Sequence, residues 1–377
     1  MDKNFYFFVG KAGQQEQGFA LYRYSEENGQ PELLRDGKER IKTGAHFFCK
    51  DRHLFYLTDE IAGPAGGYAV AYRFDTEGRL QKLSDECTHA NLPAYCWLDK
   101  TGKYLFVAHH ATEKETVKTS FADGCLSSLR RQDSAALEVF SIKENGSIGP
   151  CIQMLDYSSL KSREGCRFSH IHSVMEDPSG RFLVATDKGK SSLYTLTLSK
   201  GNKAAAEKDT EGLLRESDCV QHPVLYRTRY TAFHPTKNYL YCNGEDSFDI
   251  YGYSYTPEGK LTEICCCSAM TEPDIEKARA SEIRIHPNGK NLYAAYRSNK
   301  TIAVMKINTD GSLLPIQTIS CGGENPRGLC LSPDGRFVFV ANMDSNQILR
   351  FHTQADGSLV KDDFSLSVAG PANIGIY

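Results

Sequence analysis

The sequence has no apolar run of about 18 residues, the length that a membrane-spanning helix needs. The N-terminal stretch MDKNFYFFVG is too short and has the wrong flanks for a secretory signal. No long basic run occurs either, and 44 Lys and Arg stand against 47 Asp and Glu, which gives a formal charge of −3. These absences argue against a membrane protein and against a nucleic-acid partner, and they predict a cytoplasmic protein.

The 13 cysteines contain no CxxC pair, and an odd number cannot pair completely within one chain. In a reducing compartment they are expected to be small buried hydrophobic residues. The run Cys265-Cys266-Cys267 predicts no metal site, because adjacent side chains of a strand point to opposite faces. The G-x-S-x-G, H-E-x-x-H and P-loop motifs are also absent. We therefore expect neither a metal ion nor a cofactor.

What the sequence does have is a repeat. An apolar stretch, a tight turn and a second apolar stretch, the pattern of a β-hairpin, recur in CWLDKTGKYLFVA, VMEDPSGRFLVAT, AFHPTKNYLYCN, RIHPNGKNLYAAY and CLSPDGRFVFVAN. Their turn residues are Lys100, Pro178, Pro235, Pro287 and Pro333, and CKDRHLFYL near position 50 is a degenerate sixth copy. A period of about 50 residues is typical of propeller blades or solenoid coils.

A second series of turn glycines, in ENGQ, TEGRL, ENGSI, PEGKL, TDGSL and ADGSL, marks outer hairpins of the same units. The double gap between Gly146 and Gly259 contains the strand SSLYTLTL, so one unit there has lost its glycine. Seven units of four antiparallel strands predict an all-β, seven-bladed β-propeller as a single domain over residues 1–377. The lone terminal strands NFYFFVG and PANIGIY are expected to pair and close the ring. Three long polar stretches are predicted to be loops between strands: 111–134, 199–222 and 268–280.

Ionisable residues gather at one end of these hairpins. Counted from the turn residue, the positions six before and ten after lie at the same end, where the inner strands face the central channel. The position six before holds Ala94, His172, Arg229, Ser281 and Arg327. The position ten after holds His110, Lys188, Glu245, Arg297 and Met343. The pattern predicts an anion site with one carboxylate and one imidazole for acid/base chemistry, the alternative being charges that are merely solvated or paired.

Three further sets of residues take different roles. His170 shares the strand parity of His172 and is expected to face the same channel. Glu282 and Arg284 have the opposite parity and are predicted to be structural partners, with Arg284 in a packed position between blades. His234 and His286 precede turn prolines at the far end and are expected to be turn or cap residues.

Several segments resemble the seven-bladed propeller lactonase family, which contains the propeller type of 6-phosphogluconolactonase and the fungal carboxy-muconate lactonizing enzyme. The resemblance rests on FSHIHSVMEDPSGRFLVATD, RTRYTAFHPTKNYLYCNGED, SEIRIHPNGKNLYAAYRSNKTIAVM and NPRGLCLSPDGRFVFVANMDSNQILRF, and it is strongest from about residue 165 to 352. It implies a metal-free active site of one His, two Arg and one Glu. Matched by motif, the four catalytic positions are His172, Arg229, Glu245 and Arg297.

The remaining rim residues are expected to bind substrate: Arg327, Lys188, His170 and His110. Two motifs depart from the family pattern, since RTRY ends in Tyr230 where the family has His, and NGED surrounds Glu245 in place of N-E-L.

The function that follows first is metal-independent hydrolysis of a sugar lactone, with 6-phosphogluconolactone as a candidate. A cycloisomerase that closes a carboxy-muconate-like polycarboxylate to a lactone is the second reading, because the same arginines would bind carboxylates. A non-catalytic propeller that serves as a binding platform is the third. The expected partner is a small anionic lactone or polycarboxylate, and the sequence leaves the oligomeric state open.

Overall fold

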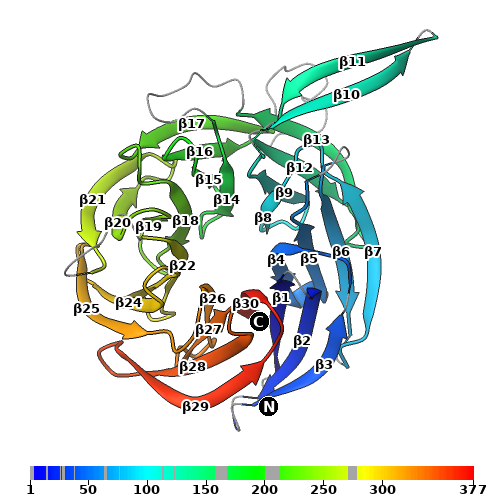
Figure 1. Cartoon of the computed structure of the whole chain (residues 1–377). Coiled ribbons are helices and arrows are strands. Elements are labelled where there is room, and N and C mark those ends of the chain that lie inside the picture. Colours follow the sequence, from blue (N-terminus) through cyan, green and yellow to red (C-terminus); the bar gives the residue numbers. More distant parts are fainter. Residues whose placement is uncertain are drawn as a thin grey trace.

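The structure is a computed structural model that describes the chain except residues 1–3, 14–15, 26, 28–29, 38, 63–65, 76, 113, 123, 134, 158–167, 200–212 and 271–277. Its strands form seven four-stranded antiparallel sheets arranged as a ring (Figure 1). This confirms the predicted seven-bladed propeller. The described residues contain one helix, the single 3₁₀ turn η1 (Lys50–Arg52), and no helix long and apolar enough to cross a membrane.

The blades follow one another in chain order around the ring. From the innermost strand to the outermost, blade 1 contains β30 (Pro371–Ile376), β1 (Asn4–Ala12), β2 (Gln17–Ser25) and β3 (Pro31–Gly37). In the same order, blade 2 contains β4 (Thr43–Cys49), β5 (Leu54–Asp59), β6 (Tyr68–Phe74) and β7 (Leu80–Cys87). Blade 3 contains β8 (Pro93–Leu98), β9 (Tyr104–His109), β12 (Ala136–Ile142) and β13 (Ile148–Asp156).

The second half of the ring repeats the arrangement. Blade 4 contains β14 (Ile171–Glu176), β15 (Phe182–Asp187), β16 (Ser192–Leu198) and β17 (Leu214–Gln221). Blade 5 contains β18 (Thr228–Phe233), β19 (Tyr239–Gly244), β20 (Asp249–Tyr255) and β21 (Leu261–Ser268). Blade 6 contains β22 (Ala280–Ile285), β23 (Asn291–Tyr296), β24 (Thr301–Ile307) and β25 (Leu313–Ser320). Blade 7 contains β26 (Pro326–Leu331), β27 (Phe337–Asn342), β28 (Gln347–Thr353) and β29 (Leu359–Ser367).

The ring is closed by the two ends of the chain, as the sequence predicts. The C-terminal strand β30 pairs antiparallel with β1, with Phe8 opposite Gly375 and Val9 opposite Ile374. The strand is therefore the innermost strand of the blade that the N-terminus begins (Figure 1). Without this pairing, both terminal strands would present open sheet edges.

The core is divided among the blade interfaces. Seven apolar clusters occupy the seven contacts between neighbouring blades, and each takes its residues from two adjacent sheets. Phe7 and Phe339, for example, join blades 1 and 7 with ring centroids 5.2 Å apart. Each blade buries one face against each neighbour, which explains why the middle strands read as nearly continuous apolar runs.

The histidines before the turn prolines connect neighbouring blades, which confirms their predicted turn and cap role. His234 donates from Nε2 to the carbonyl of Gly289 at 3.0 Å, and His286 donates in the same way to Gly335 at 3.0 Å. In each ring Nδ1 accepts a backbone N–H of its own turn. Each imidazole thus caps its own turn and binds the turn of the next blade.

Two of the three loop predictions are partly wrong. The stretch 111–134 holds a hairpin of β10 (Glu115–Ala122) and β11 (Cys125–Gln132), which projects outward from the ring in Figure 1. Within 199–222, β17 is the outer strand of blade 4. Their polar composition favoured loops, but a two-stranded ribbon or a half-exposed outer strand needs no continuous apolar face. Residues 200–212 and 271–277 of the predicted loops lie outside the described part of the chain.

Candidate functional site

Each inner hairpin ends in the same backbone hydrogen bond, which fixes the rim of the channel. The residue ten after the turn donates its N–H to the carbonyl eight before the turn: His110 to Leu92, Lys188 to His170, Glu245 to Arg227, Arg297 to Arg279 and Met343 to Asn325, all between 2.8 and 3.0 Å. The side chains that follow the second strands of these hairpins therefore start from equivalent points on a circle.

A register shift occurs near the start of each inner strand. In blade 5 the shift falls between Thr228 and Tyr230, so Arg229 is the extra residue of a β-bulge. In blade 4 it falls between Ile171 and Ser173 and leaves His172 in the same position. A bulge turns consecutive side chains toward the same side. Accordingly the guanidinium carbon of Arg229 lies 4.4 Å from the centroid of the neighbouring Tyr230 ring.

Glu245 is the centre of the rim. Its Oε2 lies 2.9 Å from Lys188 Nζ and 3.2 Å from Arg229 Nε, and its Oε1 lies 2.9 Å from Arg297 Nη2. The three cations come from blades 4, 5 and 6, so one carboxylate joins three sheets. Arg229 is also anchored through Nη1, which donates to the backbone carbonyl of Ser281.

The charged groups of this cluster shift one another's pKa values. Burial alone would raise the pKa of Glu245, but Arg229, Lys188 and Arg297 outweigh it and hold that pKa far below its usual range. Burial and the charge of Arg229 lower the pKa of Arg297 to about 10. Burial also lowers the pKa of Lys188, against the opposing effect of Glu245. The carboxylate thus remains ionised near neutral pH, paired with three cations.

Three imidazoles lie beside this cluster. The His110 ring is 4.5 Å from that of His170 and 5.5 Å from that of His172. Burial and the nearby charge of Arg229 lower the pKa of His172 well below 6.5, and burial with the charge of Lys188 lowers that of His110 to about 3. Both rings are neutral at neutral pH. The Nδ1 of His172 is buried and has no hydrogen-bond partner among the described residues.

Of the remaining positions on the predicted rim, Arg327 supplies the fourth cation. Its Nη2 lies 3.9 Å from Glu60 Oε2. Ser281 is fully buried, and its hydroxyl donates to the carbonyl of Pro326 in the next blade, so it joins blades instead of facing a ligand. Ala94 is buried and Met343 partly exposed, and neither carries an ionisable group.

Below the rim the channel contains a cavity of about 400 Å³. Its walls include Phe47, Trp97, Met175, Cys330 and Tyr377, one from each of five blades. Aromatic and sulfur-containing side chains dominate these walls, in contrast to the charged rim.

The predicted place of Arg284 is wrong. The expected ion pair exists, with Arg284 Nη1 3.2 Å from Glu282 Oε1, but both residues line the cavity instead of a packed interface between blades. Met175 and Cys330, at the equivalent positions of other blades, line it too. Strict alternation from the start of the strand gave the opposite face because it omitted the bulge, which reverses the parity of every residue after it.

The sequence analysis assigned no role at the site to two residues near it. Glu60 stands ten residues after the turn of the degenerate copy CKDRHLFYL, so the same count would have found it. Tyr230 separates the rim from the cavity, with its ring 5.0 Å from that of His172 and 5.5 Å from that of Tyr95. Only a predicted bulge could have placed the Tyr230 ring against the guanidinium of Arg229, on the same side of the strand.

Comparisons with known proteins agree with this architecture. The sequence pattern of the family described as "Lactonase, 7-bladed beta-propeller" matches residues 6–375. The chain is 23% identical over 372 residues to a 6-phosphogluconolactonase of Bacillus subtilis, with 97% of each chain covered. It is 26% identical over 297 residues to a 6-phosphogluconolactonase of Erwinia tasmaniensis, covering 78% of this chain and 76% of the other.

Among solved structures, the periplasmic gluconolactonase of Pseudomonas aeruginosa is similar in fold. The TM-score is 0.83 at 24% identity, with 99% of each chain covered. Since the family pattern spans almost the whole sequence, the chain belongs to the seven-bladed β-propeller lactonase family.

Proposed function

We propose that this member of the propeller lactonase family hydrolyses a sugar lactone without a metal ion, and that 6-phosphogluconolactone is its substrate. The observation that carries the proposal is the Glu245 cluster, in which one carboxylate holds Lys188, Arg229 and Arg297 beside the unpaired Nδ1 of His172. The relatives that match nearly the whole chain bear the lactonase name, which favours hydrolysis over the cycloisomerase and the binding platform.

The charge balance of the rim supports an anionic substrate. Four cations, Lys188, Arg229, Arg297 and Arg327, face the two carboxylates Glu245 and Glu60. A doubly charged phosphate would neutralise the excess, and guanidinium groups bind phosphate and carboxylate oxygens through paired N–H donors. The rim is thus suited to an aldono-lactone that carries a phosphate group.

The chemistry requires a water oxygen to bond to the lactone carbonyl carbon and the ring C–O bond to break. Arg229 and Arg297, fixed by Glu245, would stabilise the negative charge on the carbonyl oxygen in the tetrahedral intermediate. Neutral His172 would accept the proton of the attacking water and return it to the departing ring oxygen. Burial and the charge of Arg229 lower the pKa of His172, and a bound anion would offset the part that comes from the charge.

The direct test is a panel of aldono-lactones with and without a 6-phosphate group, with hydrolysis followed by proton release and corrected for the spontaneous rate. We expect acceleration of both classes and a higher kcat/KM for the phosphorylated lactone. A rate equal to the spontaneous rate for every lactone would refute the proposal. A preference for unphosphorylated lactones would retain the reaction and refute the substrate.

The place of action is a separate proposal. We propose a cytoplasmic location, on the basis of the free cysteines among the described residues. One structural relative is named a periplasmic enzyme, so fractionation of the producing cells is the appropriate measurement.

A further inference from the structure

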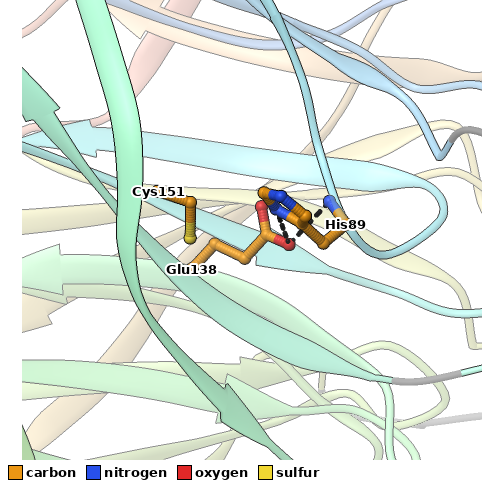
Figure 2. Close-up of side chains that lie close together, drawn as sticks. All are labelled: His89, Glu138 and Cys151. Carbon is orange, nitrogen blue, oxygen red and sulfur yellow. Dashed lines mark hydrogen bonds and ion pairs between the residues drawn. The ribbon is translucent and has the colours of Figure 1, made fainter.

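A second cluster of chemically reactive side chains lies between blades 2 and 3, outside the channel. Figure 2 shows three of its members, His89, Glu138 and Cys151, with the sulfur and the imidazole on either side of the carboxylate. Glu138 lies on β12 and Cys151 on β13, and His89 lies in the connection from β7 to β8. A fourth member, His109, ends β9.

The ligand atoms of three members converge, and His109 lies next to them against Glu138. His89 Nδ1, a carboxylate oxygen of Glu138 and Cys151 Sγ all lie within 4.8 Å of one another. His89 Nδ1 is 3.3 Å from Glu138 Oε1, and His109 Nε2 is 3.6 Å from Glu138 Oε2. The carboxylate thus presents one oxygen to each histidine.

The two fully buried members, Glu138 and His109, have polar atoms that lack hydrogen bonds. The side chains of Glu138 and His109 are both 0% exposed. Glu138 Oε1 accepts the backbone N–H of His89 at 2.7 Å, but Oε2 and both ring nitrogens of His109 have no hydrogen-bond partner among the described residues. A buried carboxylate and a buried imidazole without partners are costly, and such groups in native proteins are normally paired or bound to a metal.

From this arrangement we infer that His89, His109, Glu138 and Cys151 form a structural zinc site. A thiolate, two imidazoles and a carboxylate are borderline ligands that suit Zn²⁺, whereas Mg²⁺ and Ca²⁺ require a shell of oxygens. His89 is 57% exposed and lies in a connection, so it can move the short distance that tetrahedral coordination requires. The other three ligands lie on strands of one blade and supply a fixed frame.

Zinc binding at this site would release the proton of the Cys151 thiol. Burial and the charge of Glu138 raise the pKa of the Cys151 thiol, which donates a hydrogen bond to the carbonyl of Gln153 at 3.3 Å. Zinc would bind the thiolate, so the proton leaves to solvent and the bond to Gln153 is lost.

The site would stabilise a junction that the rim depends on. The metal would connect the β7–β8 connection of blade 2 with three strands of blade 3. His109 is followed directly by His110, whose ring stacks on His170 at the rim. The ion would thus hold the end of β9 in place without contacting the substrate.

The test compares the full-length parent with His89→Ala, Cys151→Ser and Glu138→Gln. Cys266→Ser is the matched control, because Cys266 is an exposed cysteine on a different blade. Each protein is stripped with chelator, exposed to Zn²⁺ and dialysed, and zinc per chain is measured by mass spectrometry. Co²⁺ serves as a second probe, because a thiolate ligand gives a near-ultraviolet charge-transfer band.

We expect the parent and Cys266→Ser to retain one zinc per chain and to show the cobalt band and a zinc-dependent rise in melting temperature. Cys151→Ser should lose the band, and His89→Ala should bind zinc at least about tenfold more weakly. His89→Ala changes an exposed side chain, so it should stay folded even if Glu138→Gln does not. The inference is wrong if the parent retains no zinc, or if His89→Ala and Cys151→Ser retain as much as the parent. The cluster is then a hydrogen-bonded contact between two histidines and a carboxylate.

Discussion

The rim and the cavity share one channel, yet they are built in opposite ways. The rim takes its ionisable residues from consecutive blades, from Glu60 in blade 2 and His110 in blade 3 to Arg327 in blade 7. The cavity takes bulky side chains from around the ring, including Phe47, Trp97 and Tyr377. Equivalent positions of the blades lie on a circle, so the charged side chains of consecutive blades come close together at the rim. The apolar side chains of the cavity instead fill the middle of the channel from several blades.

The two carboxylates of the channel show the difference most clearly. Glu245 has three cations, and its pKa is held far below the usual range. Glu282 is buried with Arg284 as its direct ion-pair partner, and burial outweighs the arginines and raises its pKa. The number of direct ion pairs and the depth of burial together decide whether the charge of a buried carboxylate is favoured or opposed. We interpret the first as a substrate-binding centre and the second as part of the wall.

The largest effect on stability should come from deleting the C-terminal strand, whose residues line the cavity but not the rim. Deletion of residues 372–377 removes most of β30 and leaves β1 as an open edge. We expect a large fall in melting temperature, in one cooperative transition if residues 1–377 form the single domain that the sequence predicts. Calorimetry measures both quantities. A truncated chain that melts like the parent would show that the β1–β30 pair does not hold the ring together.

Substitutions at the rim should act on turnover. Glu245→Gln, Arg297→Ala, Arg229→Ala and His172→Ala should each lower kcat by at least about tenfold and by up to about 1,000-fold, the usual range for an oxyanion donor or acid/base group. Glu282→Gln is the matched control at the wall and should remain within a few-fold of the parent. Steady-state kinetics with 6-phosphogluconolactone checks this. Equal losses for Glu245→Gln and Glu282→Gln would remove the distinction between the two regions.

At the wall, Arg284→Ala should act on stability instead. It leaves the buried Glu282 without its ion-pair partner, which costs about 3–5 kcal/mol for a fully buried pair. Because the Arg284 side chain is 32% exposed to the cavity, we expect a smaller loss of about 1–3 kcal/mol in the free energy of unfolding. Urea denaturation gives that value, and turnover should stay near that of the parent. A stable but inactive Arg284→Ala protein would move the active site into the cavity.

The pH dependence of stability should have opposite signs at the two carboxylates. Glu245 has a folded pKa below its ordinary value of 4.5, so its contribution is present above pH 4.5 and is lost as the pH falls further. Glu282 has a raised folded pKa, so its contribution is present below pH 4.5 and is lost as the pH rises. Glu245→Gln should thus flatten the acid side of the stability curve, and Glu282→Gln should gain relative to the parent with rising pH. Denaturation between pH 2 and 8 tests both, and shifts of the same sign would contradict the comparison.

Chelation should have the smallest effect on the rim. The carboxylate of Glu245 is already bound to three cations, so a divalent ion would meet repulsion there. Treatment with EDTA is expected to leave kcat at 25 °C unchanged, even if the zinc site between blades 2 and 3 is emptied and the melting temperature falls. Loss of turnover that one divalent metal restores would show that the reaction needs a metal.

Much of the site followed from counting residues. The positions six before and ten after each turn named His172, Lys188, Arg229, Glu245 and Arg297, and the structure brings these residues together. Their assignment to catalysis stays a prediction until the substitutions are made. The count missed Glu60 because it was not applied to the degenerate turn near position 50. It placed Arg284 on the wrong face because a bulge reverses strand parity.

The sequence by itself determined the repeat, and with it the blades, the closure by the terminal strands and the end of the channel where charge collects. These are local properties, since strand period, turn residues and hairpin length are written in adjacent residues. Tertiary structure alone decided which charges meet. Glu138 and His109 are 29 residues apart in sequence and meet because β12 pairs with β9 within blade 3. Arg327 and Glu60 lie on blades far apart in the chain, and closure of the ring brings them together. The bulges likewise depend on the pairing of strands, which no single strand encodes.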